Sequence, residues 1–180
     1  MPGLFIKRVA AYLIDICLLF ATLAPAALLV EKALGIFPHT MWQVWLATVV
    51  SFSIPAWLYF WLSDSSRSGA TLGKRVLHLK VVRDHGGRVG WLRALVRTAI
   101  KLLPWEMAHI FGFALAEQIG PAFQAVGLIM ANGLALTYLV VLVTNRGRRS
   151  VHDLVALTEV ELTGGYHQGK GDCGYNRTGE

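Results

Sequence analysis

An apolar run from Val9 to Val30 constrains the fold more than any other feature of the chain. A helix of this length would be about 33 Å long, which matches the roughly 30 Å hydrocarbon core of a bilayer. Lys7 and Arg8 before the run would also suit a signal peptide, but the run is too long for one and Asp15 interrupts it. We therefore expect a first transmembrane helix here.

Two further runs have the same character, Met41 to Leu62 and Ala122 to Thr144. The tryptophans of the former lie mostly toward its ends, as amphipathic rings do at head-group depth. The whole chain is 54% apolar and only 16% charged, whereas soluble domains carry about 25% charged residues. The composition excludes a water-soluble domain, a coiled coil and a disordered chain.

The segment from Trp91 to Glu117 determines how many times the chain crosses the membrane. Its first half repeats Arg93, Arg97 and Lys101 at four-residue spacing, which predicts an interfacial amphipathic helix whose basic face meets anionic head groups. Short basic loops stay on the cytoplasmic side, and those after the second and last apolar runs can both do so only if this segment crosses. We predict an all-α membrane protein with four transmembrane helices, the third starting as an interfacial helix, and both termini cytoplasmic.

Two short segments alternate apolar and polar residues, as strands do, at 77–82 and at Thr158 to Leu162. They predict a small cytoplasmic β-hairpin-like element in which Lys80 and Arg83 face the glutamates of the second strand. We expect a transmembrane domain over residues 1–162. The Gly-rich stretch 163–180 is predicted to be a disordered cytoplasmic tail.

Asp15 lies within the first apolar run. Inserting a carboxylate at the centre of a membrane helix costs roughly 2.5 to 3.5 kcal/mol. Arg8, Tyr12 and Asp15 are spaced to form one polar stripe on a helix, which we expect to face protein neighbours. One interpretation of Asp15 is purely structural, such as an ion pair with Arg8, although both side chains lean toward the helix N-terminus. The other is a functional carboxylate that loads and releases a proton or a cation.

Asp153 follows the last apolar run and has two interpretations. It is either a helix cap or surface charge, or a cytoplasmic partner for Arg8, because the predicted topology places both residues on the same side of the membrane.

Several blocks together resemble the RDD family of prokaryotic membrane proteins: KRVAAYLID at 7–15, TLGKRVLHLKVV at 71–82, LRALVRT at 92–98 and RRSVHDLVALTEV at 148–160. The family is named for one arginine at the start of its first helix, one aspartate within that helix and a second aspartate. Arg8 and Asp15 match the first two positions, and Asp153 is the third. The resemblance implies a bacterial cytoplasmic membrane protein with a role in transport or ion exchange.

No metal, cofactor or enzymatic activity is expected, because no histidine has ligand spacing and neither cysteine adjoins a base. The net charge is +6, and the basic residues that produce it lie between the apolar runs. This placement favours lipid head groups over nucleic acid as the partner. We expect the protein to transport cations or a small solute that binds at Asp15, with or without coupling to protons. We expect it to act as a homo-oligomer or with a partner membrane protein. The alternative is a non-catalytic scaffold or accessory subunit whose basic surface binds anionic lipid or a membrane complex.

Overall fold

A computed structural model of the chain describes residues 2–35 and 37–163. Apart from Thr163, the predicted tail lies outside the described residues. Most of the described chain is helical, and the elements in order are α1 (Pro2–Leu34), α2 (Met41–Thr48), η1 (Val49–Ser53), α3 (Ile54–Ser65), α4 (Leu72–Val76), β1 (Leu79–Arg83), α5 (Trp91–His109), η2 (Ile110–Ala114), α6 (Pro121–Thr144), α7 (Val151–Ala156) and β2 (Thr158–Leu162).

Three helices are long and apolar enough to cross a membrane: Gly3–Leu34, Met41–Ser65 and Pro121–Thr144. They contain the three apolar runs found in the sequence. The predicted third crossing, α5 continued by η2, is not among these candidates, and α5 carries Arg93, Arg97, Lys101 and Glu106.

The second span contains α2, η1 and α3 in succession, and η1 is a π-helical turn. This turn ends two residues before Pro55, which has no backbone N–H and cannot make the regular helical hydrogen bond. Local π-helical adjustment is one way in which a membrane helix accommodates a proline. The irregularity therefore lies next to the proline, where a bend in the helix is expected.

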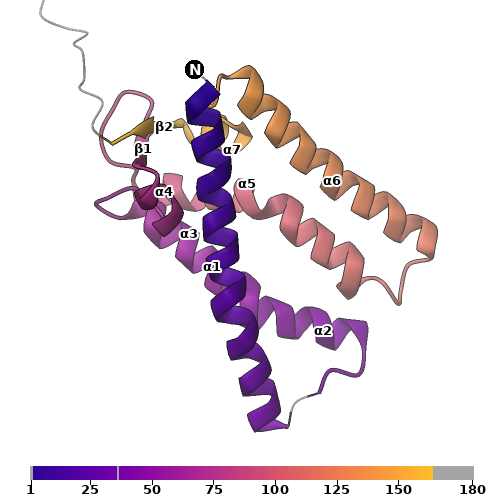
Figure 1. The fold of residues 1–180 in the computed structure, drawn as a ribbon. Coiled ribbons are helices and arrows are strands. Elements are labelled where there is room, and N and C mark those ends of the chain that lie inside the picture. The colour runs from indigo at the N-terminus through magenta and orange to yellow at the C-terminus, as the bar shows by residue number, and fades with distance from the viewer. Residues whose placement is uncertain (1, 36, 164–180) are drawn as a thin grey trace, which may run out of the picture.

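The two predicted strands are confirmed as an antiparallel pair in which Leu79 lies opposite Leu162 and Lys80 opposite Glu161. The predicted cross-strand pairing is present for Lys80, whose Nζ lies 2.9 Å from Glu161 Oε1. Buried side chains of both strands, including Val81 and Val160, pack with Ala11 of α1. The small sheet, α4 and α7 gather around the N-terminal end of α1 (Figure 1).

The long helices spread from the sheet end, and α1 points away from α5 and α6 (Figure 1). Leu19 of α1, Phe60 of α3 and Leu102 of α5 belong to one buried hydrophobic cluster, and α3 packs against α5. α5 and α6 form an antiparallel hairpin. Large hydrophobic side chains such as Leu28 and Phe123 remain exposed on the outer faces, which suits helices surrounded by lipid.

Candidate functional site

A chain of buried ion pairs joins five separate elements at the sheet end of the molecule. Lys74 Nζ of α4 lies 2.6 Å from Asp64 Oδ1 of α3, and Asp64 Oδ2 pairs with Arg97 of α5. Arg97 Nη2 lies 2.8 Å from Asp153 Oδ1 of α7, and Asp153 Oδ2 lies 2.6 Å from Arg8 Nη2 of α1. We call Lys74, Asp64, Arg97, Asp153 and Arg8 the charge chain.

Arg97 is the centre of the charge chain and is only 1% exposed. The sequence predicts it on a lipid-facing basic surface with Arg93 and Lys101, and for Arg97 that prediction is wrong. The physical reason is that its guanidinium group is matched by two buried carboxylates, one on each side. Lys101 also faces inward, with Nζ 3.3 Å from the centre of the Phe60 ring. Arg93 alone of the three is exposed.

The helix cap and the pairing with Arg8 predicted for Asp153 are both present, whereas the surface charge is not, because Asp153 is fully buried. Its carboxylate accepts a hydrogen bond from Ser150 N at 2.9 Å and so caps α7, and it also pairs with Arg8. Burial alone would raise the pKa of Asp153, but the charges of Arg97 and Arg8 hold it well below its usual range. Asp153 is therefore ionised at neutral pH.

Asp15 faces protein rather than lipid and is 1% exposed. Its Oδ1 accepts hydrogen bonds from Tyr59 Oη at 2.6 Å and Gly73 N at 2.8 Å, and its Oδ2 accepts one from Thr71 Oγ1 at 2.6 Å. The structural ion pair considered for Asp15 is not formed, because Arg8 pairs with Asp153 instead. Asp15 fastens α3 and α4 to α1 through neutral donors.

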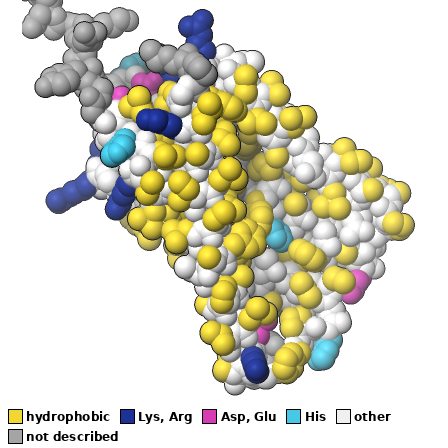
Figure 2. Space-filling view, viewed as in Figure 1, with side chains coloured by type: hydrophobic (Ala, Val, Ile, Leu, Met, Phe, Trp, Pro, Cys, Tyr) yellow, Lys and Arg dark blue, Asp and Glu magenta, His cyan; other side chains and the backbone are white. Residues whose placement is uncertain are grey.

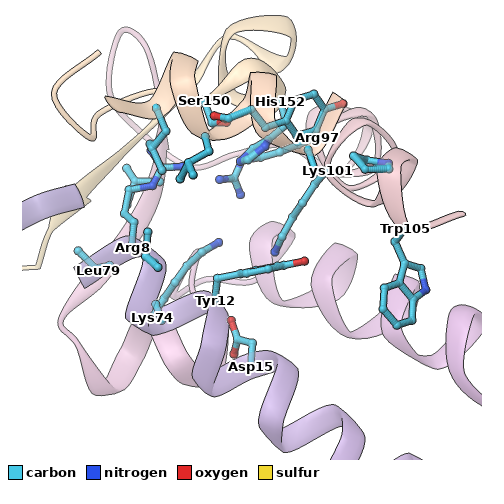
Figure 3. Close-up of a pocket in the computed structure, with 18 of the residues that line it drawn as sticks. Arg8, Tyr12, Asp15, Lys74, Leu79, Arg97, Lys101, Trp105, Ser150 and His152 are labelled. Carbon is cyan, nitrogen blue, oxygen red and sulfur yellow. The ribbon is translucent and has the colours of Figure 1, made fainter. Parts of the chain in front are cut away.

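A cavity of about 430 Å³ lies between α1, α5 and α6. The predicted stripe of Arg8, Tyr12 and Asp15 forms part of its wall, and Lys101 extends into it from α5 (Figure 3). Lys74 and Arg97 of the charge chain line the same cavity. Polar groups from elements remote in sequence are thus brought to one site.

The sequence interpretation missed Asp64 and Lys74 because it assigned both to a solvated loop. The structure extends the second span to Ser65, so Asp64 still lies on the helix, four residues after the buried Phe60 and on the same face. That spacing is the signal that would have placed Asp64 inside. Lys74 offered no comparable signal, since its environment depends on how α4 docks.

Glu106 of α5 is another acidic group within the helices, and no role was predicted for it from the sequence. It accepts hydrogen bonds from Trp57 Nε1 at 3.0 Å and Ser53 Oγ at 3.3 Å, apart from the charge chain. Among the described residues, no cluster of three His, Cys, Asp or Glu side chains is arranged to hold a metal ion.

The chain was then compared with known proteins. A model described as the RDD family matches residues 2–157. The chain belongs to the RDD family. Comparisons with curated proteins and with solved structures gave no match. Family membership and the three apolar helices make this RDD protein a membrane protein. Of the residues carried over by the resemblance, Arg8 and Asp153 form an ion pair, and Asp15 anchors α4 separately.

Acidification below about pH 6.5 is expected to destabilise this RDD protein partly through His152. Burial lowers the pKa of His152 well below 6.5, against the attraction of Asp153 and together with the repulsion of Arg97 and Arg8, so the folded protein holds it neutral. The unfolded chain binds a proton there below pH 6.5, so the folded state has its full stability above that pH and loses it as the pH falls. The melting temperature in detergent should fall less on acidification for His152→Asn than for the wild type. Equal falls would contradict this assignment.

Proposed function

We propose that this RDD protein transports a small solute across the bacterial cytoplasmic membrane and binds it in the cavity between α1, α5 and α6. The observation that carries the proposal is the cavity itself, whose volume lies in the range of small-molecule sites. Its wall combines ionised side chains with helices that have the length and apolarity of membrane spans. Charged groups in such helices are costly and usually mark a solute or ion pathway.

The proposal includes four crossings, with α5 and η2 as the third and both termini cytoplasmic. Residues 97–114 would form a helix about 27 Å long, close to the thickness of the hydrocarbon core. Pairing offsets the cost of burying Arg97, and Glu106 is hydrogen bonded to Trp57. Arg93 lies near the start of α5, where it would remain at the membrane surface.

Asp15 is the residue that would link a proton to this transport. A proton on the carboxylate would remove an acceptor and weaken the bonds from Tyr59, Thr71 and Gly73 that fasten α4 to α1. Because Lys74 of α4 lines the cavity, release of α4 would change the cavity wall. Proton binding and cavity shape are coupled in this scheme through one short helix.

The test is flux in proteoliposomes, with labelled acetate, Na⁺ and K⁺ as separate probes and a pH-sensitive dye inside. Asp15→Asn is expected to lower flux, normalised to the amount of folded protein, at least about tenfold, while Asp15→Glu retains part of it. Asparagine cannot take up a proton, whereas glutamate can. Intact flux in Asp15→Asn would remove Asp15 from the mechanism, and absence of flux of every probe through the wild type would count against transport.

A second candidate is a non-catalytic scaffold or accessory subunit in the membrane. The observation that favours it is the complete hydrogen bonding of Asp15, since a purely structural carboxylate is held in the same way. It would be supported if Asp15→Asn simply removed the folded protein and no probe moved through the wild type.

A further inference from the structure

Lys101 differs from the other cations of the cavity in having no carboxylate partner. Arg8, Lys74 and Arg97 each belong to the charge chain. Within residues 2–35 and 37–163, no carboxylate lies within ion-pairing distance of Lys101 Nζ. The ammonium group instead lies over the Phe60 ring and 5.1 Å from the centre of the Tyr12 ring.

The charges at this site do not cancel. Four cations, those of the charge chain and Lys101, face three carboxylates, those of the charge chain and Asp15. An anion beside Lys101 would offset the cost of holding an ammonium group away from water, and an added cation would be repelled. The site therefore favours a negatively charged ligand.

The rest of the cavity wall is largely apolar. Its apolar part lies on the second half of α5 and on α6, for example at Trp105, Ala131 and Leu139, while Asn132 and Tyr138 are polar members of the same α6 wall. Trp105 lies one helical turn beyond Lys101, away from Arg8 and Lys74 (Figure 3). In the space-filling view the molecule is hollowed between the α1 side and the α5–α6 side, with hydrophobic side chains along the hollow (Figure 2). An apolar ligand segment would thus find a surface next to the cationic group.

We infer that the cavity binds a single-chain amphiphile with an anionic head group, a carboxylate or a phosphate, whose charged oxygens contact Lys101 and whose hydrocarbon chain lies against α5 and α6. A cavity of about 430 Å³ suits one chain rather than a whole two-chain phospholipid. The inference rests on the proposed function in one respect, namely that this ligand is the transported solute.

Trp105 allows binding to be measured directly on the full chain in a neutral detergent. Terminally brominated undecanoate, the matching alkyl phosphate, the matching alcohol and the matching trimethylammonium are added in turn, and the fluorescence difference between wild type and Trp105→Phe isolates the quenching of Trp105. Undecanoate and the alkyl phosphate are expected to quench at concentrations about tenfold lower than the alcohol, the value of one charge-assisted hydrogen bond. The ammonium compound should bind most weakly. If only one of the two anions shows this advantage, the ligand is narrowed to a carboxylate or to a phosphate.

Lys101→Gln should abolish the advantage of the anions, and Lys101→Arg should retain it. Arg93→Gln, a charge removal at an exposed position of the same helix, is the matched control and should behave as the wild type. Equal quenching by undecanoate and alcohol in the wild type would overturn the inference. Because this comparison needs no variant, the inference can be tested even if the Lys101 variants fail to fold. Anion-selective quenching without flux would support the inferred ligand and refute transport. Flux of Na⁺ or K⁺ without selective quenching would support transport and refute the inferred ligand.

Discussion

Arg97→Gln is expected to reduce the amount of folded protein strongly. The change leaves Asp64 and Asp153, both fully buried, without the guanidinium group that lies between them. Removing one partner of a buried ion pair typically costs about 3 to 5 kcal/mol. Because Lys74 still pairs with Asp64 and Arg8 with Asp153, we expect the lower end of that range. We expect a sharp loss of monodisperse protein on size exclusion and a large fall in melting temperature in detergent.

Two companion variants make this result specific to the charge chain. Arg93→Gln removes a charge from an exposed position on the same helix and should change stability by no more than about 0.5 kcal/mol. Arg97→Lys keeps the charge but lacks the planar group that reaches Asp64 and Asp153 together, so it should lie between the other two. Similar melting of Arg97→Gln and Arg93→Gln would contradict the buried position of Arg97.

The features that the sequence predicted well depend on local patterns. The length and apolarity of the run after Val9 predicted a membrane helix, and alternation alone located β2 at Thr158–Leu162. The cost of a carboxylate in lipid was enough to expect that Asp15 faces protein, because no lipid-facing arrangement would satisfy it. Each of these inferences needs only the chain within one element.

The position of Arg97 could not be predicted in this way. Four-residue spacing shows that Arg93, Arg97 and Lys101 lie near one another on one helix, but not what that helix contacts. The answer depends on Asp64 and Asp153, which lie 33 and 56 residues away along the chain. An amphipathic interfacial helix and a helix whose basic residues are neutralised by remote carboxylates have the same local pattern.

The docking of α4 on α1 likewise cannot be predicted from local sequence patterns. It leads to the second large effect that we expect, a loss of stability on substitution of Gly73. A Cβ atom at Gly73 would overlap the carbonyl oxygen of Ala11 and would lie 3.0 Å from Asp15 Oδ1. The carbonyl belongs to the backbone of α1 and cannot move aside as a side chain could. Helix propensity alone predicts that alanine stabilises a helical glycine position by about 1 kcal/mol. At Gly73 we expect the opposite sign.

Gly73→Ala should lower stability by about 1 to 3 kcal/mol, the usual cost of overpacking, because α4 must move away from α1 and stretch the bond from Gly73 N to Asp15. Gly133→Ala in α6 is the matched control, since a Cβ there meets nothing within 4 Å, and it should melt at or above the wild-type temperature. The measurement is thermal melting of both variants in the same detergent. If Gly73→Ala and Gly133→Ala have the same melting temperature, α4 does not pack closely against α1. The hydrogen bond from Gly73 N to Asp15, and the proposed effect of Asp15 on the cavity wall, would then be wrong.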